Sequence, residues 1–152
     1  MRAIIQRVKE ASVKVDNKIV GEIGQGYLIL FGAGKNDNED ILEKFWLKIR
    51  NMRIFSDQNG KTNLDINAVQ ASVLLVSQFT LYADCRKGNR PSFTDACPAA
   101  KAEDLYNKFI DLAVKDLGER KVGRGVFGAD MEVSLINDGP FTIYLDSNEI
   151  IK

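Results

Sequence analysis

The stretch Gly26-Tyr-Leu-Ile-Leu-Phe-Gly32 holds an unbroken apolar run between glycines, and Gly24 and Gly34 lie just outside it. A strand with one solvated face alternates apolar and polar residues, whereas a strand buried on both faces is apolar throughout. We therefore predict a central buried strand over 27–31.

A second buried strand is predicted over 71–82, with polar residues toward its end. Apolar residues recur at helical spacing over 37–52 and again over 98–117, where Gly118 follows as a residue suited to end a helix. The sequence therefore predicts two strand-helix units in the middle of the chain.

Shorter strand patterns occupy both ends of the chain. Apolar and β-branched residues alternate with period two over 2–8, 11–15, 18–23, 120–126, 131–137 and 141–146. No repeat or linker divides the 152 residues, which is a common length for one domain. We predict a single mixed α/β domain over 1–152, with two main helices covering a sheet layer.

The charge balance and the absence of histidine limit the possible chemistry. The chain has 21 Lys plus Arg and 21 Asp plus Glu, so its net charge is zero, which disfavours capture of nucleic acid along a broad basic surface. Without histidine it lacks the usual general base near neutral pH and the commonest metal ligand. These absences argue against catalytic triads and zinc hydrolysis. We expect neither a metal site nor a cofactor.

The cysteine content and the N-terminal sequence bear on the cellular compartment. Cys85 and Cys97 have no metal-ligand spacing, and a secreted chain of this size would more often carry a denser disulfide set. The N-terminus has no signal-peptide pattern, and no stretch approaches the roughly 20 apolar residues of a membrane span. We expect a cytoplasmic protein without a membrane partner.

Polar residues near the end of the 71–82 strand pattern indicate a possible site. Ser77, Gln78 and Thr80 supply two hydroxyls and an amide, which can bind an ester or a ribose without titrating. The same groups can instead hydrogen-bond neighbouring backbone, and the pattern alone leaves both interpretations open.

Two further features have ordinary interpretations on pattern alone. Gly139-Pro140 joins two predicted strands, and because only about 5–6% of bonds before proline are cis, the pattern favours a trans turn. Gly123-Arg-Gly-Val-Phe-Gly128 has the spelling of a dinucleotide-binding loop, but a strand pattern follows it where that loop needs a helix.

Three motifs, in this order, strongly resemble those of the D-aminoacyl-tRNA deacylases: Ser77-Gln-Phe-Thr-Leu-Tyr-Ala-Asp84, Lys87-Gly-Asn-Arg-Pro-Ser-Phe93 and Asn137-Asp-Gly-Pro-Phe-Thr142. The stretches 1–8 and 125–131 also resemble that family, so the resemblance spans nearly the whole chain. It implies a homodimeric three-layer α/β/β fold with mixed sheets. It also implies hydrolysis of the ester that joins a D-amino acid to the 3′-terminal adenosine of tRNA, a proofreading reaction.

The resemblance further implies roles for individual residues. In this family the Gly-Pro motif is cis and reaches into the partner subunit's pocket, so Gly139 and Pro140 would present main-chain carbonyls that exclude L-amino acids. Arg7 matches the arginine that holds this motif. Phe141 stands where we expect a smaller aliphatic residue, which bears on pocket depth. We assign contacts with the tRNA to a further set of residues: Arg86, Lys87, Arg90 and Phe93.

The chemistry implied by the resemblance needs no histidine. An aminoacyl ester is already activated and the neighbouring ribose 2′-hydroxyl can assist water, so the protein mainly positions the ester and stabilises the oxyanion. We expect the backbone N–H groups of Phe79 and Thr80 to stabilise it, Gln78 and the Thr80 hydroxyl to orient the substrate, and Ser77 to support the strand end. Thr80 as a nucleophile is an open alternative. A main-chain wall would also accept glycine, including glycine mischarged on tRNA-Ala.

The competing interpretation is a non-enzymatic dimer of the same fold that binds nucleic acid through the basic loop 86–90, with Phe79 and Phe93 stacking on bases. An inactive dimeric scaffold is a third possibility, because a fold alone does not fix activity.

Overall fold

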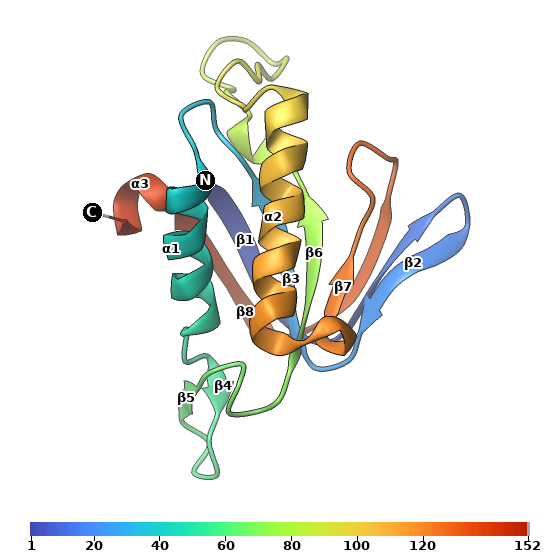
Figure 1. The fold of residues 1–152 in the computed structure, drawn as a ribbon, viewed down its shortest axis with the longest axis vertical. Helices are drawn as coiled ribbons and strands as arrows, with labels where there is room; N and C mark the ends of the chain where they lie inside the picture. The colour runs from blue at the N-terminus through green and yellow to red at the C-terminus, as the bar shows by residue number, and fades with distance from the viewer. Residues whose placement is uncertain (152) are drawn as a thin grey trace.

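The N-terminal strand organises the sheet, as the computed structural model of residues 1–151 shows (Figure 1). This strand, β1, pairs antiparallel with β2, β3 and β8, while β3 pairs in parallel with β6, and β6 with β7. Together they form one mixed six-stranded sheet. The strands are β1 (Arg2–Val15), β2 (Lys18–Ile23), β3 (Gly26–Gly32), β6 (Ser72–Ser77), β7 (Val122–Arg124) and β8 (Glu132–Asp146).

The predicted strands 2–8 and 11–15 are the two halves of β1. The first half pairs with β3 and the second with β2, while β8 follows both halves and changes register on either side of Val8. Because such irregularities bend a strand and increase its twist, β1 can leave one layer of the fold and enter another.

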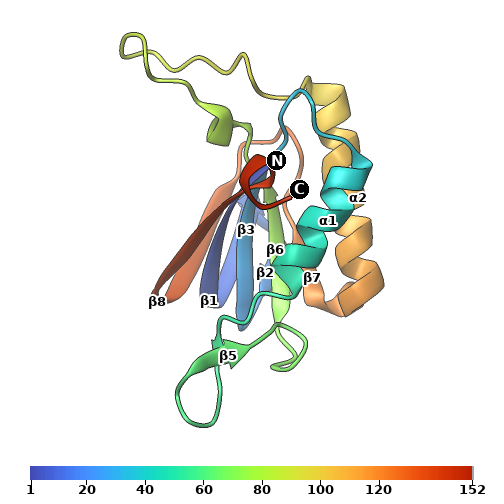
Figure 2. The ribbon, with the colours of Figure 1, turned by 90° about the vertical axis from the view of Figure 1, so that its left-hand side faces the viewer.

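Two helices cover one face of the sheet (Figure 2). α1 (Glu39–Arg50) follows β3, and α2 (Ala99–Leu117) precedes β7. The predicted helices over 37–52 and 98–117 are confirmed. The side chain of Asn38 accepts from the Ile41 N–H and so caps α1. Both helices bury an apolar stripe against the sheet, formed by Leu42, Phe45, Trp46 and Ile49 of α1 and by Leu105, Tyr106, Phe109, Ile110 and Ala113 of α2.

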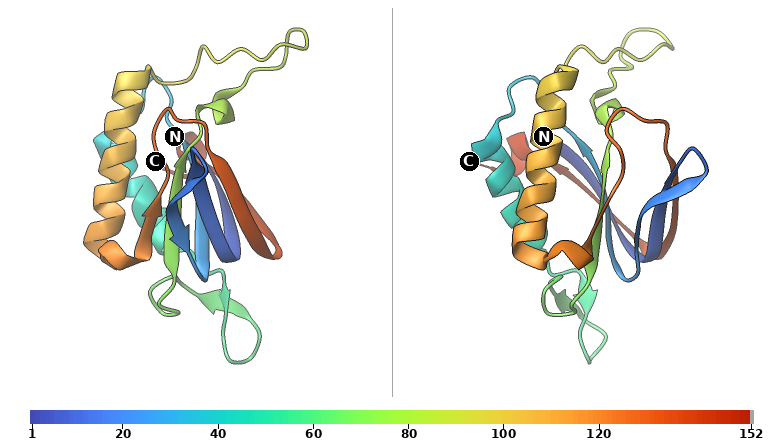
Figure 3. Two further views of the ribbon diagram at one scale, coloured as in Figure 1. Left: turned by 90° about the vertical axis from the view of Figure 1, so that its right-hand side faces the viewer. Right: turned by 45° about the vertical axis from the view of Figure 1, so that its right-hand side comes forward.

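The opposite face of the sheet is covered by the chain's own strands. A second apolar cluster joins residues of the far half of β1 to the inner strands, namely Val8, Ala11, Val13, Leu28, Leu74 and Val76. Val133 and Leu135 of β8 pack against it. Figures 2 and 3 show β8 on the side away from the helices. The layers therefore follow the predicted α/β/β order, with both β layers formed by different parts of the one six-stranded sheet.

Several local predictions are wrong. Residues 79–82 form the 3-10 helix η1 (Phe79–Tyr82) and do not extend the strand. The reason is that β3 ends at Gly32, which leaves the chain beyond Ser77 without a strand to pair with. The Leu81 N–H instead bonds back to the Gln78 carbonyl at 3.3 Å.

The C-terminal third also differs from the prediction. The patterns 131–137 and 141–146 belong to one strand, β8, and only Val122–Arg124 of the pattern 120–126 is a strand, preceded by the 3-10 helix η2 (Glu119–Lys121). A short unpredicted helix, α3 (Ser147–Ile150), follows β8. Around the turn after Ser56, a ribbon forms from β4 (Phe55–Ser56) and β5 (Thr62–Leu64). None of the helices within residues 1–151 has the length and apolar character needed to cross a membrane.

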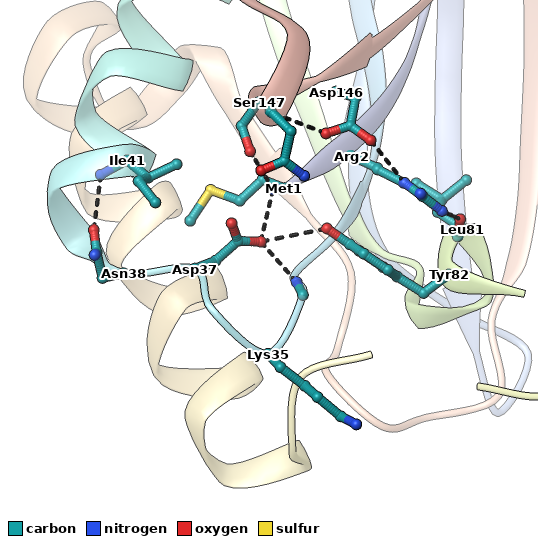
Figure 4. A network of polar contacts seen from close by, with 12 residues as sticks. Met1, Arg2, Lys35, Asp37, Asn38, Ile41, Leu81, Tyr82, Asp146 and Ser147 are labelled. Carbon is teal, nitrogen blue, oxygen red and sulfur yellow. Dashed lines mark hydrogen bonds and ion pairs between the residues drawn. The ribbon is translucent and has the colours of Figure 1, made fainter. Parts of the chain in front are cut away.

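A buried ion pair ties β1 to the loop before α1 (Figure 4). The α-ammonium of Met1 lies 2.7 Å from the Asp37 carboxylate and also donates to the hydroxyl of Ser147. The Gly34 N–H and the Tyr82 hydroxyl donate to the same carboxylate at 2.7 and 3.4 Å. The Asp37 carboxylate therefore connects the start of β1 with η1, and the Met1 ammonium extends the connection to Ser147, which follows β8.

Arg2 reinforces this connection from the other side of Tyr82. Its guanidinium donates to the Asp146 carboxylate at 3.0 Å and to the Leu81 carbonyl at 2.9 Å, and it lies 4.5 Å from the centre of the Tyr82 ring. Burial raises the pKa of the Tyr82 hydroxyl, so this group remains a neutral donor. η1 is thus held in place by polar contacts as well as by packing.

We expect Asp37→Asn to lower the free energy of unfolding by about 3 kcal/mol, because the buried α-ammonium of Met1 loses the charge that it pairs with. Urea unfolding followed by circular dichroism measures the change. Asp111→Asn is the matched control, since it removes the same charge from an exposed position of α2 and should change stability by less than about 0.5 kcal/mol. Equal losses in the two variants would contradict the role of the ion pair.

Candidate functional site

A cavity of about 680 Å³ lies where β3 and β6 end. Its walls comprise 31–33 at the end of β3, 76–79 at the end of β6, residues from 93 to 106 before and within α2, and the loop 127–131. The two strands are parallel neighbours, and their pairing finishes with Phe31 opposite Ser77. In open α/β sheets, ligands bind outside the carboxyl ends of parallel strands. The cavity is therefore where such a fold is expected to hold a ligand.

Three of the four predicted catalytic residues line this cavity, and Thr80 is not among its lining residues. Ser77, Gln78 and Phe79 line it, and the Gln78 side chain donates to the exposed Thr80 hydroxyl at 2.5 Å. The Gln78 N–H donates to the Phe31 carbonyl at 2.7 Å, which continues the β3–β6 ladder by one bond before the chain turns. The sheet thus fixes the point from which η1 begins.

Within residues 1–151, the start of η1 has no side-chain cap. The first N–H groups of a helix have no partner within it. The N–H groups of Phe79 and Thr80 therefore have no partner within η1.

Aromatic and buried polar groups complete the cavity. Phe79 is 57% exposed and meets Phe93, another lining residue, edge to face at 5.0 Å. The Tyr106 hydroxyl donates to the Leu75 carbonyl at 2.8 Å, and burial raises the pKa of Tyr106 to about 12. Burial also raises the pKa of the Cys97 thiol. Neither group ionises at neutral pH, so neither provides a base or an anionic nucleophile.

The Gly139–Pro140 peptide bond is cis, so the trans turn that the pattern alone favours is wrong. Both residues are exposed and neither lines the cavity. Arg7 holds the adjoining segment: its side chain donates to the Asp138 carbonyl at 3.0 Å and its guanidinium lies 4.3 Å from the centre of the Phe141 ring. Phe141 therefore packs against Arg7 and is not among the residues lining the cavity of its own chain.

Asn137 has a positioning role that the sequence did not reveal. Its side-chain amide donates to the Phe141 carbonyl and accepts from the Phe141 N–H, both at 2.9 Å, so it clamps the turn on either side of the motif. A Cβ built on Gly139 would lie only 1.9 Å from the Phe141 nitrogen. The turn therefore has no room for a side chain at 139. The signal in the sequence was an amide residue four positions before Phe141.

Within one chain, the Gly139–Pro140 motif and the cavity are far apart. Arg2 of β1 pairs with Gly32 at the cavity end, whereas Arg7 pairs with Tyr27 and contacts the motif segment. Five residues of strand span about 17 Å. A single chain therefore does not bring the predicted selection residues to the predicted catalytic residues.

The predicted RNA-contacting residues lie on a projecting loop (Figure 3). Asp84 and Ser92 close the loop through two backbone hydrogen bonds of 2.7 and 2.9 Å. Arg86, Lys87 and Arg90 are exposed on it. The Arg86 guanidinium donates to both oxygens of the Asp84 carboxylate at 2.8 and 2.7 Å, which lowers the pKa of Asp84 to about 2. Part of the Arg86 charge is thus already neutralised.

Residues 1–151 contain no cluster of three or more His, Cys, Asp or Glu side chains arranged to hold a metal ion.

A family profile and two known proteins match this chain over nearly its whole length. The sequence profile of the D-Tyr-tRNA(Tyr) deacylase family matches residues 4–146. A D-aminoacyl-tRNA deacylase of Dictyoglomus turgidum is 53% identical over all of this chain and 96% of its own length. One of Thermosipho africanus is 51% identical over 99% of both chains.

Solved structures share the fold. A c-Myc DNA unwinding element binding protein superposes with a TM-score of 0.91 at 40% identity, covering 96% of this chain and 98% of its own. A probable eukaryotic D-amino acid tRNA deacylase superposes with a TM-score of 0.82 over 95% of this chain and 97% of its own; at 17% identity this shows the fold alone. With a profile match over most of the sequence and relatives above 50% identity along its length, the chain belongs to the D-aminoacyl-tRNA deacylase family.

Proposed function

We propose that this protein hydrolyses the ester of D-aminoacyl-tRNA and releases the free D-amino acid and the tRNA. The observation that carries the proposal is the cavity at the ends of β3 and β6, into which η1 begins without a side-chain cap. Such a site offers hydrogen-bond donors to an oxyanion in surroundings that are largely apolar. Family membership supplies the substrate class.

The reaction requires placement more than acid–base chemistry. Water adds to the ester carbonyl, assisted by the ribose 2′-hydroxyl, and the N–H groups of Phe79 and Thr80 stabilise the oxyanion that forms. The carbon–oxygen bond to the ribose then breaks, and the ribose oxygen takes up a proton. Gln78 and the Thr80 hydroxyl, which are hydrogen-bonded to each other, orient the ester. Ser77 supports the strand end.

Chiral selection is assigned to Gly139 and Pro140 of a second copy. These residues are exposed and do not line the cavity of their own chain, which supports a homodimer whose sites are completed across the interface. Main-chain carbonyls test the configuration at the α-carbon without reading the side chain. The proposal therefore extends to many D-amino acids and to glycine, including glycine mischarged on tRNA-Ala.

The tRNA end reaches the site beside the basic loop. Lys87 and Arg90 are exposed there, and Phe93 joins the loop to the cavity. Few phosphate contacts are needed to hold one acceptor end, which accords with a net charge of zero.

A second candidate is a nucleic-acid-binding dimer without esterase activity. The 57% exposure of Phe79 favours it, since exposed aromatic rings stack on bases. The solved relative described as a DNA unwinding element binding protein gives a further reason to test it.

The purified protein should cleave D-Tyr-tRNA at least about a hundredfold faster than L-Tyr-tRNA, because only the L side chain collides with the carbonyl wall. Glycyl-tRNA should be cleaved as well. Release of labelled amino acid measures all three rates. Equal rates for the two tyrosyl esters would contradict selection by the main-chain carbonyls. Binding of the tRNA without any cleavage would favour the second candidate.

Gly139→Ala should reduce the preference for D-Tyr-tRNA over L-Tyr-tRNA by about tenfold or more, because an alanine Cβ displaces the turn that carries the wall. Mixing this variant with Thr80→Ala tests which chain supplies the wall. A mixed dimer combines an intact cavity from one chain with an intact motif from the other, so D-selective activity should return. No recovery in purified mixed dimers would show that the motif does not act across the interface.

Thr80→Ala should lower kcat by about tenfold to a hundredfold if Thr80 only orients the ester, and by much more if it is the nucleophile. Rapid-quench kinetics on D-Tyr-tRNA, followed by mass spectrometry of the protein, distinguishes the two roles. We expect no acylated protein. Thr62→Ala, at an exposed position of β5, should leave the rate unchanged. A covalent adduct at Thr80 would establish the nucleophilic mechanism instead.

A further inference from the structure

Among the residues that line the cavity one is charged, Asp130, and this residue is exposed to solvent at the cavity wall. The other lining residues are neutral, and among residues 1–151 no Lys or Arg forms an ion pair with Asp130. A carboxylate that neither pairs with a cation nor packs in the core contributes little to the fold. At the wall of the cavity this exposed carboxylate is available to a cationic group of a bound ligand.

The loop that carries Asp130 is fixed at both ends. At its start, the Gly125 N–H donates to the carbonyl of Leu75 in β6 at 2.9 Å. At its finish, Val133 of β8 pairs with Val13 of β1. Between them, the Phe127 ring packs 6.0 Å from the ring of the buried Tyr106. These anchors hold Asp130 at the wall of the same cavity that Ser77 and Gln78 line.

The charges of the substrate identify what this carboxylate can bind. A D-aminoacyl adenosine at the end of tRNA has neutral base and ribose groups and anionic phosphates, and its α-ammonium is the sole cation. An anionic side chain attracts that ammonium and repels phosphate, and the attraction is stronger beside apolar walls than in water.

Resting on the function proposed above, we propose that Asp130 is a specificity residue that binds the α-ammonium of the aminoacyl group and thereby orients the ester. The contact also distinguishes substrate from product. Hydrolysis turns the ester into a carboxylate within the cavity, and Asp130 repels this new negative charge, which favours release of the amino acid.

The test compares D-Tyr-tRNA with tRNA that carries D-3-(4-hydroxyphenyl)lactate, in which a hydroxyl replaces the α-ammonium. The wild-type protein should favour the ammonium substrate in kcat/KM by about tenfold, as expected for a charge-assisted hydrogen bond. Asp130→Asn should lose this preference by cleaving D-Tyr-tRNA about tenfold less efficiently and the hydroxy ester equally well. If the hydroxy ester is cleaved too slowly to measure, its inhibition constant against D-Tyr-tRNA replaces kcat/KM.

Two further variants separate this role from a structural one. Glu132→Gln removes an equal charge from the exposed start of β8, outside the cavity, and should leave the preference intact. Asp130→Glu should restore part of it. Equal losses on both substrates in Asp130→Asn, or an unchanged preference, would overturn the inference while leaving the proposed function standing. A wild-type protein that cleaves neither ester would overturn the proposed function and the inference together.

Discussion

The parallel pairing of β3 with β6 is the constraint on which the rest of the structure depends. Parallel neighbours end at the same edge, so Phe31 and Ser77 finish side by side and the chain must leave the sheet there. One departing segment becomes the loop before α1 and the other becomes η1. Because parallel strands need long crossover connections, α1 and α2 are placed on the face that those connections cross. The cavity is the space that these departures leave.

The sequence predicted what depends on local patterns and missed what depends on distant partners. The apolar run 27–31 and the periodicity of the two helices carry their own signal, and each element formed as expected. Residues 79–82 have the composition of a strand, but whether they form one depends on the length of β3, some fifty residues earlier. Likewise Tyr106 reads as one more residue of an apolar helix stripe, although it contributes to the cavity.

In the candidate site, too, the residues marked by a local pattern were predicted and those positioned by distant contacts were not. Ser77, Gln78 and Thr80 were predicted as site residues because they are polar residues ending an apolar run. The resemblance to a family supports the same prediction. Asp130 was not predicted as a site residue, because its position at the cavity follows from a loop anchored to β6 and β8. The separation of Gly139–Pro140 from the cavity is visible only when the register of β1 is known. Neither the composition nor the spacing of motifs indicates that one chain keeps the Gly139–Pro140 motif away from the cavity.

The pairing of β1 with β8 affects how the chain folds during its synthesis. Arg2 contacts Asp146 across 144 positions of sequence, and contacts of that range form slowly because a long loop must close first. Until β8 arrives, β1 presents an unpaired edge and the second apolar cluster lacks the cover of Val133 and Leu135. A chain still on the ribosome therefore exposes a strand edge that can pair with other strands. The strand that finally covers this edge, β8, also carries the Gly139–Pro140 motif.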